Sequence, residues 1–88
     1  MDESLYNEEK RLLLALERKE ANAFKQFHKK YGEDLILFTY SLVNDIVVAT
    51  RIVERLFERL WVESKFHLVE PPIYKFLLAE IRHICSSK

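Results

Sequence analysis

Apolar residues recur along the first half of this chain at spacings of three and four, the period of an amphipathic α-helix. The pattern predicts a first helix from about Leu5 to Arg18, with Leu12, Leu13 and Leu16 at helical spacing. Residues 21–43 continue in the same period, with Phe24, Phe27 and Tyr31 on one face, followed by Leu35, Phe38 and Leu42. Gly32 interrupts this stretch and is suited to a break or a left-handed cap. We therefore expect 21–43 to form one bent helix or two stacked ones.

Asn44 and Asp45 mark the clearest boundary in the sequence. Asn tolerates the left-handed conformation at a helix end, and an Asp carboxylate accepts from the exposed amides of the next helix. A third helix is predicted from Ile46 to about Lys65. Its apolar residues form a nearly continuous stripe: Ala49, Ile52, Val53, Leu56, Phe57, Leu60 and Trp61.

The two prolines predict a loop over 67–72, because Glu70-Pro71-Pro72 cannot continue a helix. Pro72 suits the first turn of a fourth helix, predicted from Ile73 to about Ser86. Its inward residues are expected to be Phe76, Leu77, Ile81 and Ile84. The pattern as a whole predicts an all-α fold, a compact bundle of four to five helices that forms a single domain over 1–88.

Composition narrows the function classes. Lysine plus arginine equals aspartate plus glutamate, 14 of each, and this neutral charge argues against a module that binds phosphate over a broad surface. Cys85 is the only cysteine, so no internal disulfide can form and a cytoplasmic location fits best. The first ten residues are polar and acidic, which does not suit a signal peptide, and no apolar run reaches the roughly 20 residues of a membrane span.

Candidate chemistry is sparse. The three histidines and Cys85 lack the spacing of a metal site, and no glycine-rich phosphate loop or nucleophile motif occurs. Acidic residues alternate with basic ones along the predicted helices, which is typical of solvated faces with ion pairs. We expect neither an enzyme nor a cofactor, and no membrane partner.

Three segments resemble a known family. The first contains Leu12–Leu16, Glu20-Ala21-Asn22-Ala23-Phe24 and Tyr31. The second, Leu42-Val43-Asn44-Asp45 followed by Ala49, Ile52-Val53, Phe57 and Arg59-Leu60-Trp61, is similar to L-T-x-D-x-x-x-A-E-D-[IL]-V-Q-E-V-F-x-[KR]-L-W. The third is Phe76-Leu77 with Ile81-Arg82-His83-Ile84-Cys85. Over about 12–86, this ordered set resembles region 2 of extracytoplasmic-function (ECF) sigma factors, within the sigma-70 family.

The resemblance implies a transcription-initiation module that binds core RNA polymerase and recognises and melts the minus-ten promoter element. In that family, the third helix contacts the clamp helices of the polymerase β′ subunit, a loop captures a flipped base, and the fourth helix faces DNA. By position, the polymerase-binding residues would be Thr50, Arg51, Glu54, Arg55 and Glu58. The base-capture loop would lie within Lys65 to Glu70. The DNA-binding residues would be Lys65, His67, Tyr74, Lys75, Arg82 and His83.

Structural interpretations compete with these roles. Phe66 is expected to close the core, and Tyr74 fits base stacking and half-burial equally well. Lys75 and Arg82 are seven residues apart and share a helix face, which suits phosphate contacts or solvent. Core packing is expected for Trp61 and Cys85.

The third helix departs from the family in its charges. Arg51 and Arg55 stand where the family is acidic, and with Arg59 they form a basic stripe at i, i+4 spacing. One interpretation is internal ion pairing, of Glu54 with Arg51 and of Glu58 with Arg55 or Arg59. The other is a changed partner, because reversed charges at a docking surface disfavour the old one.

Two alternatives therefore stay open beside initiation. One is a sigma-like interaction module that no longer initiates and that titrates an anti-sigma factor or binds another partner. The other is a helical bundle without a nucleic-acid role, such as half of an oligomer. The chain ends at Ser86-Ser87-Lys88 without the second DNA-binding domain of the family, as expected for either an excised domain or a naturally short relative.

Overall fold

The computed structural model describes residues 3–86, and they form an all-α bundle. Four α-helices follow one another: α1 (Glu3–Glu17), α2 (Ala21–Val43), α3 (Ile46–Val62) and α4 (Ile73–Ser86). A short 3₁₀ helix, η1 (Phe66–Leu68), lies between α3 and α4. The prediction of an all-α bundle of four to five helices is thus confirmed.

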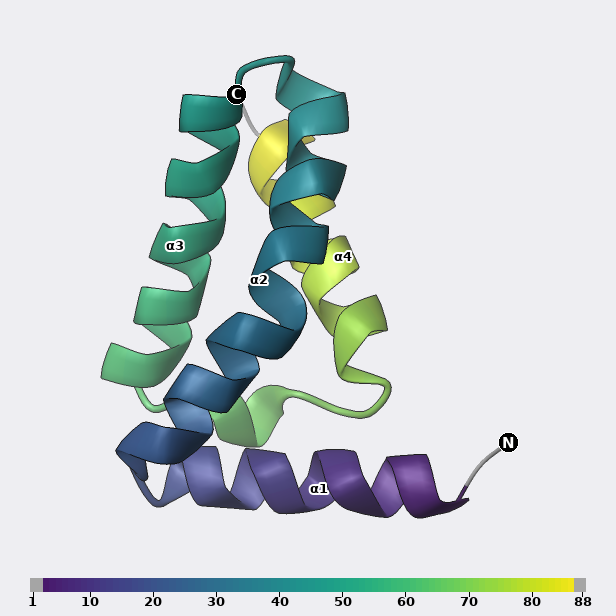
Figure 1. Cartoon of the computed structure of the whole chain (residues 1–88), viewed down its shortest axis with the longest axis vertical. Coiled ribbons are helices and arrows are strands. Elements are labelled where there is room, and N and C mark those ends of the chain that lie inside the picture. The colour runs from purple at the N-terminus through teal and green to yellow at the C-terminus, as the bar shows by residue number, and fades with distance from the viewer. Residues whose placement is uncertain (1–2, 87–88) are drawn as a thin grey trace.

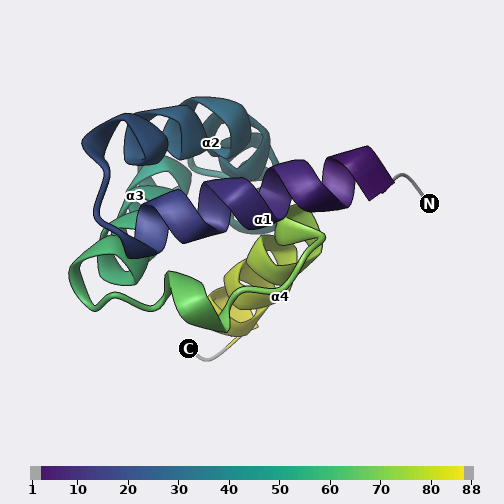
Figure 2. The same cartoon turned by 90° about the horizontal axis from the view of Figure 1, so that it is seen from below.

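Helix α2 is the centre of the arrangement (Figure 1). It packs between α3 on one side and α4 on the other, and α1 lies across one end of these three helices. Seen from below, α1 runs beside η1 and the loop that leads into α4 (Figure 2). The loop after α3 is therefore held against a helix from the other end of the sequence.

The turn between α2 and α3 forms as its sequence predicts. Asn44 ends α2 in the left-handed conformation, with φ 58° and ψ 30°, and its amide donates to the Tyr40 carbonyl at 2.8 Å. Asp45 is the N-cap of α3, and its Oδ1 accepts from the amides of Val47 and Val48 at 3.0 and 3.1 Å. These contacts satisfy backbone groups that the two helix ends would leave unpaired.

Three predicted boundaries need correction. Gly32 is neither a break nor a cap, because it lies buried inside the continuous helix α2. A Cβ at this position would stand 3.3 Å from His28 Nδ1, a tight contact within α2, and 3.9 Å from Phe57 Cε2, an ordinary contact with α3. Helix α3 ends at Val62 rather than near Lys65, with Ser64 in the left-handed region at φ 55°. The predicted loop is partly helical, since His67 and Leu68 belong to η1.

The core is a single cluster to which α1, α2, α3, η1 and α4 all contribute. Phe27 of α2 stands at its centre, fully buried, with ring centroids 4.8 Å from Phe57, 5.1 Å from Phe66 and 5.1 Å from Tyr31. The burial of Phe66, 1% exposed, confirms its expected core role. Leu42 was placed in the apolar face of α2 but is 46% exposed, because α2 extends past the end of the packed stripe there.

Candidate functional site

The five residues implied in polymerase binding all lie on α3, but the helix presents them to different surroundings. Arg51, Glu54, Arg55 and Glu58 are exposed, whereas Thr50 is half-buried and its hydroxyl donates to the Ile46 carbonyl at 2.8 Å. The Thr50 hydroxyl therefore has its hydrogen-bond partner within the helix. The four charged side chains are available for contacts outside the chain.

Helix α3 directs four of its charges to two different sides, while Arg51 shares a hollow at the start of the helix with Glu54. Glu54 and Glu58 line a groove that α3 forms with α2. Arg55 and Arg59 line a hollow on the opposite side, next to Ile84 of α4. Internal ion pairing, one of the two interpretations of the sequence, is not seen in the described residues: Glu54 and Glu58 form no salt bridge with Arg51, Arg55 or Arg59. In the stretch 3–86 the salt bridge that does form joins Lys65 Nζ to Glu63 Oε1 at 3.1 Å.

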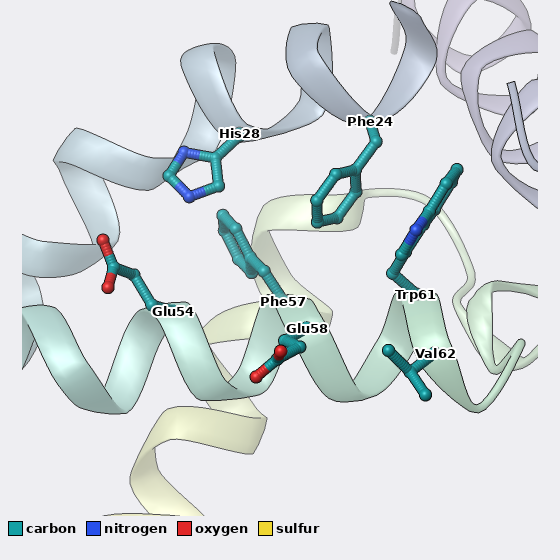
Figure 3. A pocket seen from close by; sticks show the side chains of 7 residues that line it. All are labelled: Phe24, His28, Glu54, Phe57, Glu58, Trp61 and Val62. Atoms are coloured by element: carbon teal, nitrogen blue, oxygen red, sulfur yellow. The ribbon is translucent and has the colours of Figure 1, made fainter. Parts of the chain in front are cut away.

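Aromatic rings form the floor and walls of the α2/α3 groove, which we define by Phe24, His28, Glu54, Phe57, Glu58, Trp61 and Val62 (Figure 3). It is an open hollow of about 380 Å³. Phe24 stacks on Trp61, with centroids 4.6 Å apart and planes inclined by 25°. His28 stands edge-on to Phe57 at 5.3 Å. Trp61 thus packs against the core from its edge and remains half-buried, less enclosed than expected.

Lys19 lies beside Trp61, at one end of the aromatic rings of the α2/α3 groove. It lies in the short α1–α2 connection with φ 63°. Its ammonium group stands 4.8 Å from the centroid of the Trp61 ring, and it donates a hydrogen bond to the Trp61 carbonyl. The negative face of the indole and the carbonyl at the end of α3 both favour a cation here.

The loop implied in base capture exposes little aromatic surface. Phe66 points into the core, so stacking on a base falls to Tyr74, which is 38% exposed. His67 is exposed, and its Nδ1 lies 2.8 Å from the Ser64 carbonyl oxygen, which requires a proton on Nδ1. Lys65 is exposed but engaged with Glu63.

The outer face of α4 carries the other candidate DNA contacts. Lys75, Arg82 and His83 are all exposed there. The only acid of this helix, Glu80, is half-buried instead. The Arg82 guanidinium also lies 5.9 Å from the ring centroid of Phe38 in α2. Ile84 and Cys85 are half-buried beside the core, which is less burial than the sequence predicted for both.

The sequence did not predict one buried polar contact, between α1 and the start of α4. Glu9 of α1 is 6% exposed, and its Oε1 accepts from the backbone amide of Ile73, the first residue of α4, at 2.8 Å. Pro72 precedes Ile73 and offers no side-chain oxygen for a cap, so the carboxylate comes from α1. The contact fixes α1 to the start of α4 and to the loop before it.

The Tyr31 hydroxyl lies buried without a hydrogen-bond partner in residues 3–86. Burial, together with the negative charges of Glu9 and Glu8, raises the pKa of Tyr31 from 10.0 to about 12. An unpartnered buried hydroxyl costs roughly 1–3 kcal/mol relative to an apolar group of similar shape.

Tyr31→Phe is therefore expected to keep or raise stability, by up to about 1 kcal/mol at pH 7, in urea unfolding followed by circular dichroism. It should also change how the free energy of unfolding depends on pH above about pH 10. The folded pKa lies above the unfolded one, so Tyr31 loses its proton first in the unfolded chain and wild-type stability falls between pH 10 and about 12. The stability of the variant should fall less between pH 10 and about 12. A clear destabilisation at pH 7 would mean that the hydroxyl is satisfied.

Comparison with known proteins leaves the chain without an identified relative. No family model, no curated protein and no solved structure matches it. No helix in residues 3–86 has the length and apolar content needed to cross a membrane. The same residues contain no group of three histidine, cysteine or acidic side chains that could hold a metal ion.

Proposed function

We propose that the chain is a transcription-initiation module that binds core RNA polymerase through α3 and minus-ten promoter DNA through the 65–70 loop and α4. The observation that carries the proposal is how α3 distributes its motif residues. Ala49, Val53, Phe57 and Leu60 are buried, while the charged positions between them are exposed. This is the division that a helix needs if one face builds the core and the other docks on a partner.

The structure around the 65–70 loop supports the proposed binding of DNA. The loop is held in place by the burial of Phe66 and Val69 and by the Glu9–Ile73 hydrogen bond. Tyr74 is exposed next to it, and the outer face of α4 is basic. Such a surface provides a ring for stacking and cations for phosphates on a rigid support.

Binding of a single-stranded minus-ten oligonucleotide, measured by fluorescence anisotropy at several salt concentrations, tests the proposed binding of DNA. We expect affinity to fall with salt, and Lys75→Gln with Arg82→Gln to reduce the slope of log K against log salt by about 1.4, at about 0.7 per phosphate contact. Lys29→Gln, on the exposed side of α2, is the control and should leave the slope nearly unchanged. Equal slopes in the wild type and the double variant would contradict the assignment of α4.

A second candidate is an interaction module that does not initiate transcription. It is favoured by the apolar side chains beside Arg51, since Ile46 and Val47 are exposed and line a hollow with it at the start of α3. Polymerase affinity of Arg51→Asp with Arg55→Glu separates the two functions. A steep rise from no binding would indicate that α3 serves another partner. Loss of existing binding would indicate that the clamp contact uses the basic residues.

A further inference from the structure

The α2/α3 groove combines an aromatic floor with an acidic rim. Phe24 and Trp61, both half-buried, and the exposed Val62 provide the apolar surface above the fully buried Phe57, and Glu54 and Glu58 stand on α3 at its edge (Figure 3). The groove is open, so a free small molecule would bury only part of its surface there. A side chain presented by a larger partner fits such a shape better.

The two rim carboxylates are poised for a cation. They are i, i+4 neighbours on the same side of α3, with Cβ atoms about 5–6 Å apart, and like charges at this spacing repel. Both are exposed, and neither has a salt-bridge partner in the described part of the chain. A positive group between them would relieve the repulsion and gain two charge-assisted hydrogen bonds.

One cation of the chain itself already lies on a ring of the groove. Lys19 lies over Trp61, whose ring stacks on Phe24 inside the groove. The Trp61 ring at this end of the groove thus already accepts a positive group. The rim of the groove adds the carboxylates that are absent from the Lys19 contact.

We propose that the α2/α3 groove binds an arginine side chain of a protein partner, which rests on the proposed role of α3 as a docking helix. The planar guanidinium stacks on the half-buried rings of the groove and forks towards Glu54 and Glu58, and the methylene stem packs on the exposed Val62. Arginine fits better than lysine because its flat, weakly hydrated head makes both the stacking and the two-pronged contact. The acidic edge of α3 thus selects basic partners, although the opposite edge of the same helix is itself basic.

The proposal is tested with a small probe on the whole chain. N-acetyl-arginine amide is titrated while the fluorescence of Trp61, the only tryptophan, and its indole N–H NMR signal are recorded. We expect a saturable change with a Kd on the order of 1–10 mM, as suits one side chain. N-acetyl-citrulline amide has nearly the same shape without the charge and should bind at least about tenfold more weakly.

Variants locate the binding. Glu54→Gln with Glu58→Gln should abolish saturation by the arginine probe. Glu33→Gln with Asp34→Asn removes the same charge from an exposed part of α2 and should leave the titration unchanged. Circular dichroism confirms that each variant is folded.

Three results would each overturn the proposal: no saturable signal from the wild-type chain, equal binding of the citrulline probe, or full binding by the Glu54/Glu58 variant. None of them bears on polymerase binding, which is measured separately with the polymerase itself. A chain that binds the arginine probe but not polymerase would retain the groove and lose the transcription role.

Discussion

Phe27→Ala is expected to cost about 3–5 kcal/mol of unfolding free energy, the largest loss of any single change considered. The ring is fully buried and touches Tyr31 on its own helix, Phe57 on α3 and Phe66 in η1. Truncation removes these contacts and leaves a cavity that three separate elements would have to move to fill. Small domains have total stabilities of about 5–15 kcal/mol, so the variant should be partly unfolded at 37 °C.

Urea unfolding followed by circular dichroism provides the measurement. Phe27→Leu keeps most of the volume and should cost clearly less than the alanine variant. Leu14→Ala, at an exposed position of α1, should stay within about 0.5 kcal/mol of wild type. If Phe27→Ala were as mild as Leu14→Ala, Phe27 could not be the centre of the core.

Glu9→Ala is expected to cost about 2–3 kcal/mol at pH 7, an unusual loss for an acidic residue on an amphipathic surface helix. Its carboxylate accepts from the Ile73 amide at 2.8 Å, at a helix N-terminus where the helix dipole favours negative charge. The alanine variant leaves that amide buried and unpaired. Glu9→Gln retains an acceptor oxygen without the charge and should fall between alanine and wild type.

The matched control is Glu17→Ala, an exposed glutamate of the same helix, which should change stability by less than about 0.5 kcal/mol. Hydrogen exchange adds a local readout, since the first turn of α4 should lose protection in Glu9→Ala more than the middle of α3 does. Equal stability of the two alanine variants would show that the buried contact contributes nothing.

Local signals in the sequence were sufficient for most of the fold. The capping chemistry of Asn44 and Asp45 correctly placed the end of α2 and the start of α3. Proline placed the start of α4 at Ile73. These predictions succeed because each depends on neighbours within a few residues.

The features that the sequence could not supply depend on distant residues. Gly32 resembles a helix break in the sequence, but it lies buried inside α2 beside His28 and Phe57. The cap of α4 comes from Glu9, 64 positions away. The charges of α3 resemble an ion-paired stripe, but the neighbouring helices assign Glu54 and Glu58 to the α2 side and Arg55 and Arg59 to the α4 side.

The arrangement of charges on α3 leaves negative charge at the α2/α3 groove. Arg55 lies on the α4 side, away from the α2/α3 groove, whereas Arg51 shares a hollow at the start of α3 with Glu54, and Glu54 and Glu58 keep the groove edge acidic. A partner that contacts α3 from the α2 side would therefore still meet negative charge. Arg55 would act on a partner that reaches the α4-facing side of the helix, and Arg51 on one that reaches its first turns.

Titration of the fluorescently labelled full chain with core RNA polymerase tests the central claim most directly. Circular dichroism of the same sample establishes that the helices are intact. The proposed function predicts saturable binding with a Kd of about 10 μM or tighter, which corresponds to a docking free energy of about 7 kcal/mol. A flat titration well beyond that concentration, with the helical fold intact, would contradict it.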